Sequence, residues 1–135
     1  MSCTYIRNVK IGDDKTAVCV PITGSNADEI HTQLSEAVIY NPDIIEWRCD
    51  CLNSVKREDV ETILPMIRRI AKDSAVLFTF RTSNEGGNKI INDNDYYDVN
   101  ILAASTGCVD LVDVEACSRA HLSKELIRDL QDMDV

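Results

Sequence analysis

Three charged residues alternate along one short, otherwise apolar segment of the chain: Glu46, Arg48 and Asp50. Alternate residues of a β-strand share one face, so this spacing directs the three side chains to the same side. The opposite face would carry the apolar residues of the segment, Ile45, Trp47 and Cys49. Placing two acids and an arginine on one inward face costs free energy unless they pair or meet a ligand. The pattern indicates either an internal ion pair that only stabilises the fold or a binding site.

Charged residues recur at the ends of the next two apolar segments. Arg81 follows Ala75–Phe80, and Glu115 ends the apolar segment after it. In parallel α/β folds, ligands bind at the carboxyl ends of the strands, so we expect Arg48 and Arg81 to lie on one rim. Two guanidiniums there suit a small carboxylate, a hydroxylated acid or an inorganic anion. Glu46 would orient an arginine or accept a hydrogen bond from a ligand hydroxyl.

The chain carries no motif for the common catalytic or cofactor chemistries. It contains neither GxGxxG nor a P-loop, and no lysine lies inside a predicted strand, where desolvation would lower its pKa. Neither His31 nor His121 lies at a predicted strand end. Cys49 and Cys51 have the spacing of half a metal site, but no second Cys/His pair has matching spacing. We therefore expect binding groups without a catalytic residue, a metal or a cofactor.

Hydrophobic periodicity divides the chain into alternating strands and helices that would position these groups. Predicted strand centres are 27, 32 and 34 residues apart, at Val18, Ile45, Leu77 and Leu111. A helical pattern in each interval is typical of βα units around a parallel sheet, with right-handed crossovers placing the helices on one face. The predicted strands are an N-terminal hairpin of 5–11 with 16–21, closed by Pro21, and then 44–48, 75–80 and 109–114. The predicted helices run from Ser25 or Asn26 to about 40, over 54–72 with a kink or break at Pro65, from Asp93 or Asn94 to about 105, and from about 123.

Composition and charge exclude several classes of protein. The 135 residues predict one domain, 1–135, and the apolar (44%) and charged (27%) fractions are those of a globular protein. A net charge of −9 argues against a nucleic-acid partner, and the absence of a basic run or a long apolar stretch argues against a membrane. No signal-peptide pattern opens the chain. Six cysteines, mostly within predicted strands, are therefore expected to be reduced, buried thiols of a cytoplasmic protein.

The charged strand ends belong to a larger set of motifs that resembles type I 3-dehydroquinate dehydratase, the Schiff-base lyase of the shikimate pathway, which leads to the aromatic amino acids. The motifs match in order and spacing along nearly the whole chain, at Val18–Gly24, Glu46–Asp50, Leu77–Thr82, Glu85–Gly87 and Val109–Glu115. The resemblance implies a (β/α)8 TIM barrel of about 250 residues, of which this chain would be the first half, a half-barrel of one β-hairpin plus four βα units. It also implies that Glu46, Arg48 and Arg81 bind substrate and that Glu85 is the acid of the loop beside the site.

The resemblance further implies two catalytic residues that this sequence does not contain. In the family, a lysine on the sixth strand forms an imine with the substrate ketone, and a histidine on the fifth strand moves the protons. The sequence reaches Val135 where the fifth strand would begin, as expected for a truncated homologue. Without the amine no iminium acidifies the neighbouring C–H, and without the histidine there is no positioned base. We therefore expect no dehydratase activity from the chain alone.

Four βα units would leave the first and fourth strands as unpaired edges beside an apolar inner face. We expect two copies to pair as a homodimer that completes an eight-stranded barrel, whose mouth carries Glu46, Arg48, Arg81 and Glu85 twice. The doubled guanidiniums would attract a carboxylate, phosphate or sulfate, unless the doubled acids neutralise them. The alternatives are half of a split dehydratase completed by a second chain, an anion-binding or regulatory module, and a structural fragment with internal ion pairs.

Overall fold

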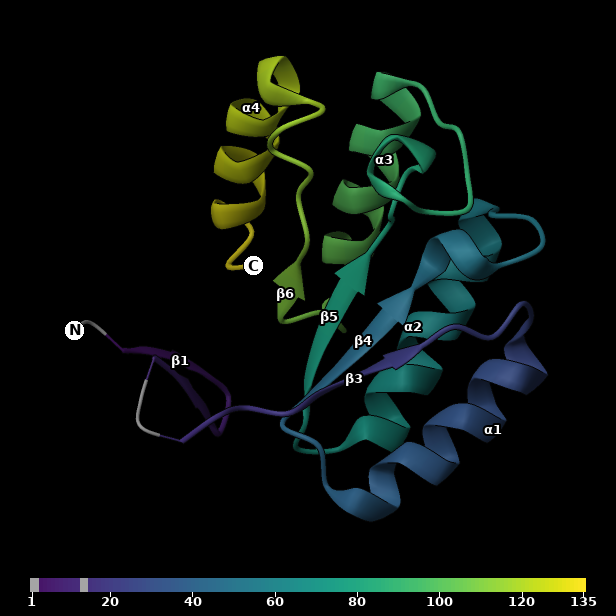
Figure 1. Ribbon diagram of the computed structural model, residues 1–135, viewed down its shortest axis with the longest axis vertical. Helices are drawn as coiled ribbons and strands as arrows, with labels where there is room; N and C mark the ends of the chain where they lie inside the picture. Colours follow the sequence, from purple (N-terminus) through teal and green to yellow (C-terminus); the bar gives the residue numbers. More distant parts are fainter. Residues whose placement is uncertain (1–2, 13–14) are drawn as a thin grey trace.

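A four-stranded parallel sheet in the order β3-β4-β5-β6 forms the centre of the computed structural model, which describes residues 3–12 and 15–135. Each strand leads into a helix (Figure 1). The strands are β3 (Cys19–Ile22), β4 (Ile44–Arg48), β5 (Ala75–Thr79) and β6 (Leu111–Val112). The helices are α1 (Ala27–Ala37), α2 (Arg57–Ala71), α3 (Asp93–Ser105) and α4 (Ala120–Gln131), with short 3-10 turns η1 (Val38–Tyr40), η2 (Cys49–Cys51) and η3 (Ser83–Glu85). The predicted α/β fold with a parallel sheet is confirmed.

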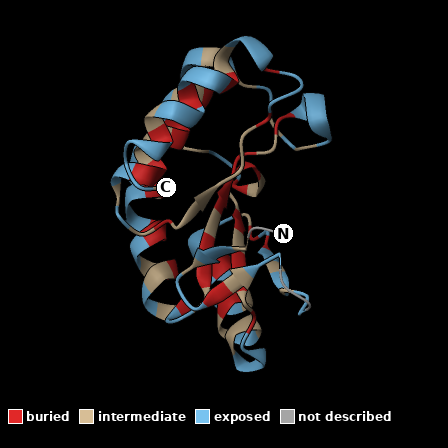
Figure 2. Ribbon diagram, turned by 90° about the vertical axis from the view of Figure 1, so that its left-hand side faces the viewer, coloured by how far each residue is buried: buried red, intermediate tan, exposed pale blue. Residues whose placement is uncertain are grey.

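The main core lies between the helices and one face of the sheet. In β4, Ile45 and Trp47 are fully buried against the helices, whereas Glu46 and Arg48 on the opposite face are only partly buried. The Trp47 ring meets Phe78 of β5 edge to face at 5.6 Å between centroids. Figure 2 shows the buried residues, in red, on the strands and on the sides of the helices that face the sheet. The period-two pattern of β4 therefore directs its charged residues away from the core, as the sequence predicted.

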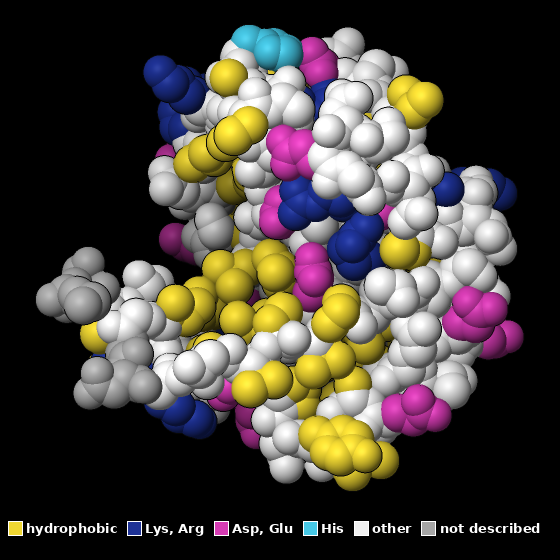
Figure 3. All heavy atoms as spheres, viewed as in Figure 1, with side chains coloured by type: hydrophobic (Ala, Val, Ile, Leu, Met, Phe, Trp, Pro, Cys, Tyr) yellow, Lys and Arg dark blue, Asp and Glu magenta, His cyan; other side chains and the backbone are white. Residues whose placement is uncertain are grey.

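The other face of the sheet is covered only at the amino ends of its strands. There the hairpin of β1 (Thr4–Ile6) and β2 (Val9–Ile11) brings Val9 against Ile44 and Ala75 in a small second cluster. An ion pair of 2.6 Å between Arg7 and Asp110 ties the hairpin to the segment before β6. Figure 3 shows hydrophobic side chains gathered on the uncovered part of this face, beside a band of charged ones.

The N-terminal strands differ from the predicted hairpin. β1 and β2 pair with each other, and the chain reverses at Arg7, whose φ is 51°, so the expected pairing of 5–11 with 16–21 is wrong. Residues 13 and 14 of the expected turn lie outside the described residues. Pro21 lies inside β3 rather than closing it. β3 is an edge strand, and the 3.0 Å bond from the Ile44 N–H to the Val18 carbonyl shows which alternate residues face β4, so the proline nitrogen faces the open edge.

The observed helix boundaries lie closer to the predicted ones than the N-terminal strands do. Asn26 caps α1 as predicted, its side chain accepting the Glu29 N–H at 3.0 Å. α2 is one helix across Pro65, so the predicted alternative of two helices is wrong. α3 is capped by Asn92, immediately before the predicted caps, and α4 begins at Ala120 rather than near 123. No helix in the described ranges is long and apolar enough to cross a membrane.

The expectation of buried cysteines is wrong for five of the six. All six are free thiols, and only Cys49 is buried. Cys19 is exposed because it alternates with the core-facing Val20 and Ile22 and so lies on the face of β3 away from the helices, and Cys117 because it lies in the loop after β6. Burial raises the pKa of the Cys49 thiol far above its ordinary value, which keeps that thiol protonated and inert.

Candidate functional site

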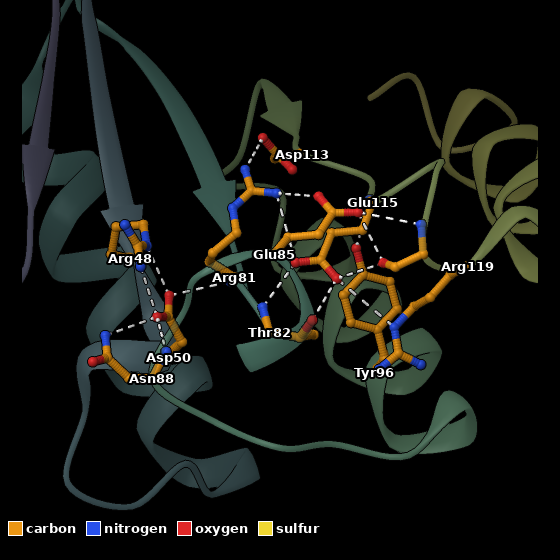
Figure 4. A network of polar contacts seen from close by, with 11 residues as sticks. Arg48, Asp50, Arg81, Thr82, Glu85, Asn88, Tyr96, Asp113, Glu115 and Arg119 are labelled. Atoms are coloured by element: carbon orange, nitrogen blue, oxygen red, sulfur yellow. Dashed lines mark hydrogen bonds and ion pairs between the residues drawn. The ribbon is translucent and has the colours of Figure 1, made fainter.

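Three of the four predicted binding residues, Arg48, Arg81 and Glu85, lie near one another where β4, β5 and β6 end (Figure 4). Arg48 is the last residue of β4, Arg81 follows β5, and Glu85 lies in η3. Their positions follow from parallel pairing in register, which sets Arg48 opposite Thr79 and brings the two strands to an end together. The structure thus brings the two arginines to one rim.

A buried carboxylate, Asp50, holds the β4 side of this rim. It accepts two bonds of 2.8 Å from the guanidinium of Arg48 and one of 3.2 Å from the Arg81 N–H. The backbone and side-chain N–H groups of Asn88 complete its shell at 3.2 and 3.1 Å. Burial alone would raise the pKa of Asp50, but these donors outweigh it and the pKa lies below its ordinary value. The carboxylate is therefore ionised and links β4, the end of β5 and the following loop.

Asp50 departs from its predicted position. The sequence placed it on the β4 face with Glu46 and Arg48, but β4 ends at Arg48 and Asp50 lies in η2. The turn of η2 is what brings its carboxylate back to Arg48 and under the Arg81 backbone. The hydrogen bond to Asp50 has the largest effect on Arg48: it raises the pKa of the guanidinium above its ordinary value, so the group stays charged.

Arg81 lies among three carboxylates. Its Nη2 donates to Asp113 at 2.8 Å, and its Nη1 donates to Glu85 at 3.1 Å and lies 3.6 Å from Glu115. Desolvation would lower the pKa of Arg81, but the three acids raise it above its ordinary value. Two of its partners, Glu85 and Asp113, are about 30% exposed as side chains, whereas Glu115 is fully buried.

Glu115 is anchored from several directions. It accepts the Thr82 N–H at 2.8 Å and the Thr82 hydroxyl at 2.7 Å, and its own N–H donates to the Tyr96 hydroxyl at 3.0 Å. Arg119 lies on its far side, Nε being 3.9 Å away, with the guanidinium 4.6 Å from the centre of the Tyr96 ring. The acid is therefore fixed before any ligand binds.

Glu46 behaves differently from the other acids. It lies in β4 opposite Pro21 on one neighbouring strand and Leu77 on the other, and is partly buried. Its carboxylate makes no hydrogen bond or ion pair with the residues that the structure describes. It does not orient Arg48, which is held by Asp50, and it is available to a ligand on the uncovered face.

The glycines after Glu85 form a tight connection rather than a flexible one. The Gly87 N–H donates to the Thr82 carbonyl at 2.8 Å, and a Cβ on Gly87 would lie 1.8 Å from the carbonyl oxygen of Arg81. Gly86 has a φ of 85°, a conformation that favours glycine. The two glycines allow the loop to fold back so that Asn88 reaches Asp50.

Several residues of this network were not predicted as site residues. Asn88, Thr82 and Ser118 are short polar residues of loops, and Tyr96 and Arg119 lie at or near helix starts, so no periodic pattern marks them. The Gly-Gly pair was the signal available for Asn88, because a chain reversal there returns the following residue to the strand ends.

Neither lysine nor histidine is found on the strands of the sheet. None of the six lysines lies in β3–β6, and the two histidines lie in α1 and α4. His121 instead contacts Asp93 at 2.6 Å on the surface. Within the described ranges, no group of three or more His, Cys, Asp or Glu side chains is placed to hold a metal ion.

A family model described as type I 3-dehydroquinase matches residues 18–135. The chain belongs to this family. The 3-dehydroquinate dehydratase of Listeria monocytogenes is 36% identical over 116 residues, which are 85% of this chain and 46% of that protein. The enzyme of the same name from Bacillus velezensis is 35% identical over 136 residues, covering 100% of this chain and 54% of its own length. The chain thus spans about half the length of these relatives.

Solved structures of the family share the fold described above. The type I 3-dehydroquinate dehydratase of Clostridium difficile, determined with covalently modified comenic acid, superposes with a TM-score of 0.94 at 33% identity. The match covers 99% of this chain and 53% of that one. The enzyme from Geobacillus kaustophilus gives a TM-score of 0.93 at 26% identity, over 99% of this chain and 52% of its own. The sheet and its four helices are therefore similar to part of the type I dehydroquinase TIM barrel.

Proposed function

We propose that this chain forms the substrate-binding half of a type I 3-dehydroquinate dehydratase site. Arg48 and Arg81 bind the carboxylate and hydroxyls of 3-dehydroquinate, Glu46 accepts a substrate hydroxyl, and Glu85 borders the site. The observation that carries this proposal is that two charged guanidiniums lie at the carboxyl ends of adjacent strands, in a chain of this family. Planar guanidiniums suit a carboxylate because each offers parallel N–H groups.

The guanidiniums have unequal freedom to take up a ligand. Arg48 uses Nε and Nη2 for Asp50, which leaves its Nη1 without a partner in the described chain. Arg81 donates from Nη1 to Glu85 and from Nη2 to Asp113, so a ligand carboxylate at Nη2 competes with the solvent-accessible Asp113. One of the site's own carboxylates, Asp113, therefore occupies a position on Arg81 where a substrate carboxylate would bind.

Dehydration needs groups that these residues do not supply. The family chemistry acidifies the C–H beside the ketone by converting the ketone to an iminium, which requires an amine, and then moves protons with a base. The sheet of this chain holds carboxylates and guanidiniums but no lysine or histidine. We infer that it binds and orients the substrate, while the covalent step requires residues from another part of the barrel.

The first expected result is binding without turnover. Titration calorimetry of the 135-residue chain with 3-dehydroquinate should show saturable binding, because both guanidiniums are in place. The absorbance of the conjugated product, 3-dehydroshikimate, should increase no faster than in a protein-free sample. Product formation proportional to the concentration of this chain, and lost in an Arg81→Ala preparation purified in parallel, would contradict the proposal.

We further propose that a second copy of the chain covers the open face and closes the barrel. Support comes from the edges of β3 and β6, which pair with no further strand of the described chain, and from the partly exposed apolar residues Leu77 and Leu111 on the uncovered side. Unpaired strand edges beside apolar surface favour pairing with another chain. Carboxylates outnumber guanidiniums at the rim, so the two copies bring like charges together.

The dimer predicts a specific solution behaviour. Light scattering on a sizing column should give twice the chain mass of 15.1 kDa. Because acids predominate at the rim, raising the salt concentration from low values should strengthen association by screening their repulsion. A well-folded monomer at all salt concentrations would contradict closure by a second copy. A sample that becomes monodisperse only with a second polypeptide carrying the later strands would favour a split enzyme instead.

A further inference from the structure

The segment that follows β6 contacts the site loop through a serine. The Ser118 hydroxyl donates to Glu85 Oε1 at 2.8 Å, and the Ser118 N–H approaches the same oxygen at 3.3 Å. The other oxygen of Glu85 accepts the Arg81 guanidinium at 3.1 Å. Glu85 is thereby held between an arginine of the site and a serine from the next βα connection.

The Ser118 hydroxyl has one proton and two neighbouring carboxylates. Glu85 lies at 2.8 Å, whereas the buried Glu115 lies at 3.4 Å, so the shorter contact takes the proton. Glu115 does not depend on this proton, because Thr82 supplies it with two donors. The arrangement leaves Ser118 to act on Glu85, the acid that borders the open face.

We propose that Ser118 is a positioning residue of the binding site, holding Glu85 against Arg81 so that the guanidinium is oriented before the ligand arrives. The proposal rests on the proposed function for its ligand, but the contact itself does not. Glu85 lies in a short 3-10 turn on the surface, where an untethered carboxylate would sample several rotamers. A preset Arg81–Glu85 pair spares the ligand the cost of ordering it.

Ser118 is suited to a test because it is exposed, as are its neighbours Ala116 and Cys117. Removing its hydroxyl uncovers no buried group, so Ser118→Ala should leave the thermal midpoint unchanged. Bonds from Ser118 are the first cause of the lowered pKa of Glu85. The variant should therefore raise the pKa of that carboxyl toward its ordinary value.

The experiment combines a carboxyl titration with a binding measurement. NMR of side-chain carboxyls in the ligand-free protein gives the pKa of Glu85 in wild type, Ser118→Ala, Ser118→Thr and Ser83→Ala. Ser118→Thr keeps the hydroxyl, and Ser83→Ala removes another exposed hydroxyl from the same loop. We expect a raised pKa only in Ser118→Ala, and roughly fivefold weaker binding of 3-dehydroquinate in that variant alone.

The outcomes separate this proposal from the proposed function. An unchanged Glu85 titration in Ser118→Ala would overturn the contact and the proposal with it. A raised pKa with unchanged affinity would overturn the positioning role. Failure of the wild-type protein to bind 3-dehydroquinate at all would overturn the proposed function and Ser118's part in recognition, while the titration would still decide whether the serine holds Glu85.

Discussion

Replacing Asp50 with alanine is expected to destabilise the protein by about 3–5 kcal/mol, a large share of the stability of a domain this size. The carboxylate is fully buried and accepts bonds from Arg48, the Arg81 backbone and Asn88. Its removal leaves a partly buried guanidinium and three N–H groups, one of Arg81 and two of Asn88, without their acceptor. Such orphaned groups cost more than the net value of the bonds that are lost.

Urea unfolding followed by circular dichroism measures this change. The matched control is Glu61→Ala, which removes a carboxylate from an exposed pair with Arg57 in α2, and should change the unfolding free energy by less than about 0.5 kcal/mol. Asp50→Asn should fall between the two, because it keeps the shape and one acceptor but loses the charge. A loss below about 1 kcal/mol for Asp50→Ala would show that Asp50 does not hold the strand ends together.

Asp50 also makes the free energy of unfolding depend on pH in the acidic range. Because the pKa of Asp50 is lower in the folded protein than in the unfolded chain, its stabilisation is complete above its ordinary pKa of 3.8. It is lost as the pH falls through the lower, folded value, where the carboxylate of the native state takes up a proton. Asp50→Asn should therefore show a shallower loss of stability in that acidic range than wild type.

How much of this site the sequence could predict depends on the distance along the chain between interacting residues. The faces of β4 follow from alternation alone, so the burial of Ile45 and Trp47 and the position of Arg48 on the opposite face were predictable. That Arg81 reaches the same rim followed from the general rule for parallel sheets. Both predictions use only local pattern and topology.

Partners could not be predicted in the same way. Asp50 contacts Asn88, which is 38 residues away, and Arg81 contacts Asp113, which is 32 residues away. Whether such distant residues meet in space depends on the register of neighbouring strands and on turns such as η2. Neither register nor turns leave a periodic signal in the sequence. Pro21 illustrates the same limit, because a proline that ends a central strand is tolerated within an edge strand. The charge balance at the rim therefore emerged only from the three-dimensional structure.

Replacing Arg81 with alanine is expected to weaken binding of 3-dehydroquinate by about 2–5 kcal/mol, roughly 30-fold or more. The side chain of Arg81 is 23% exposed, and Glu115 stays in place behind it while Asp113 can move aside. Arg81→Lys keeps the charge but loses the planar fork, so about a tenfold loss is expected. The control is Arg57→Ala, a 70% exposed arginine of α2 whose removal should not affect affinity.

The opposite change at Asp113 decides whether Arg81 truly exchanges partners. If a substrate carboxylate displaces Asp113 from Nη2, then Asp113→Asn removes the competing charge and should tighten binding several-fold, the scale of a partly exposed ion pair. Arg81 carries its charge throughout the accessible pH range, since its pKa is raised, so the guanidinium itself would not titrate in this comparison. Weaker binding in Asp113→Asn, measured by calorimetry beside Arg81→Ala, would mean that Asp113 orients Arg81 for the ligand rather than occupying the ligand's place.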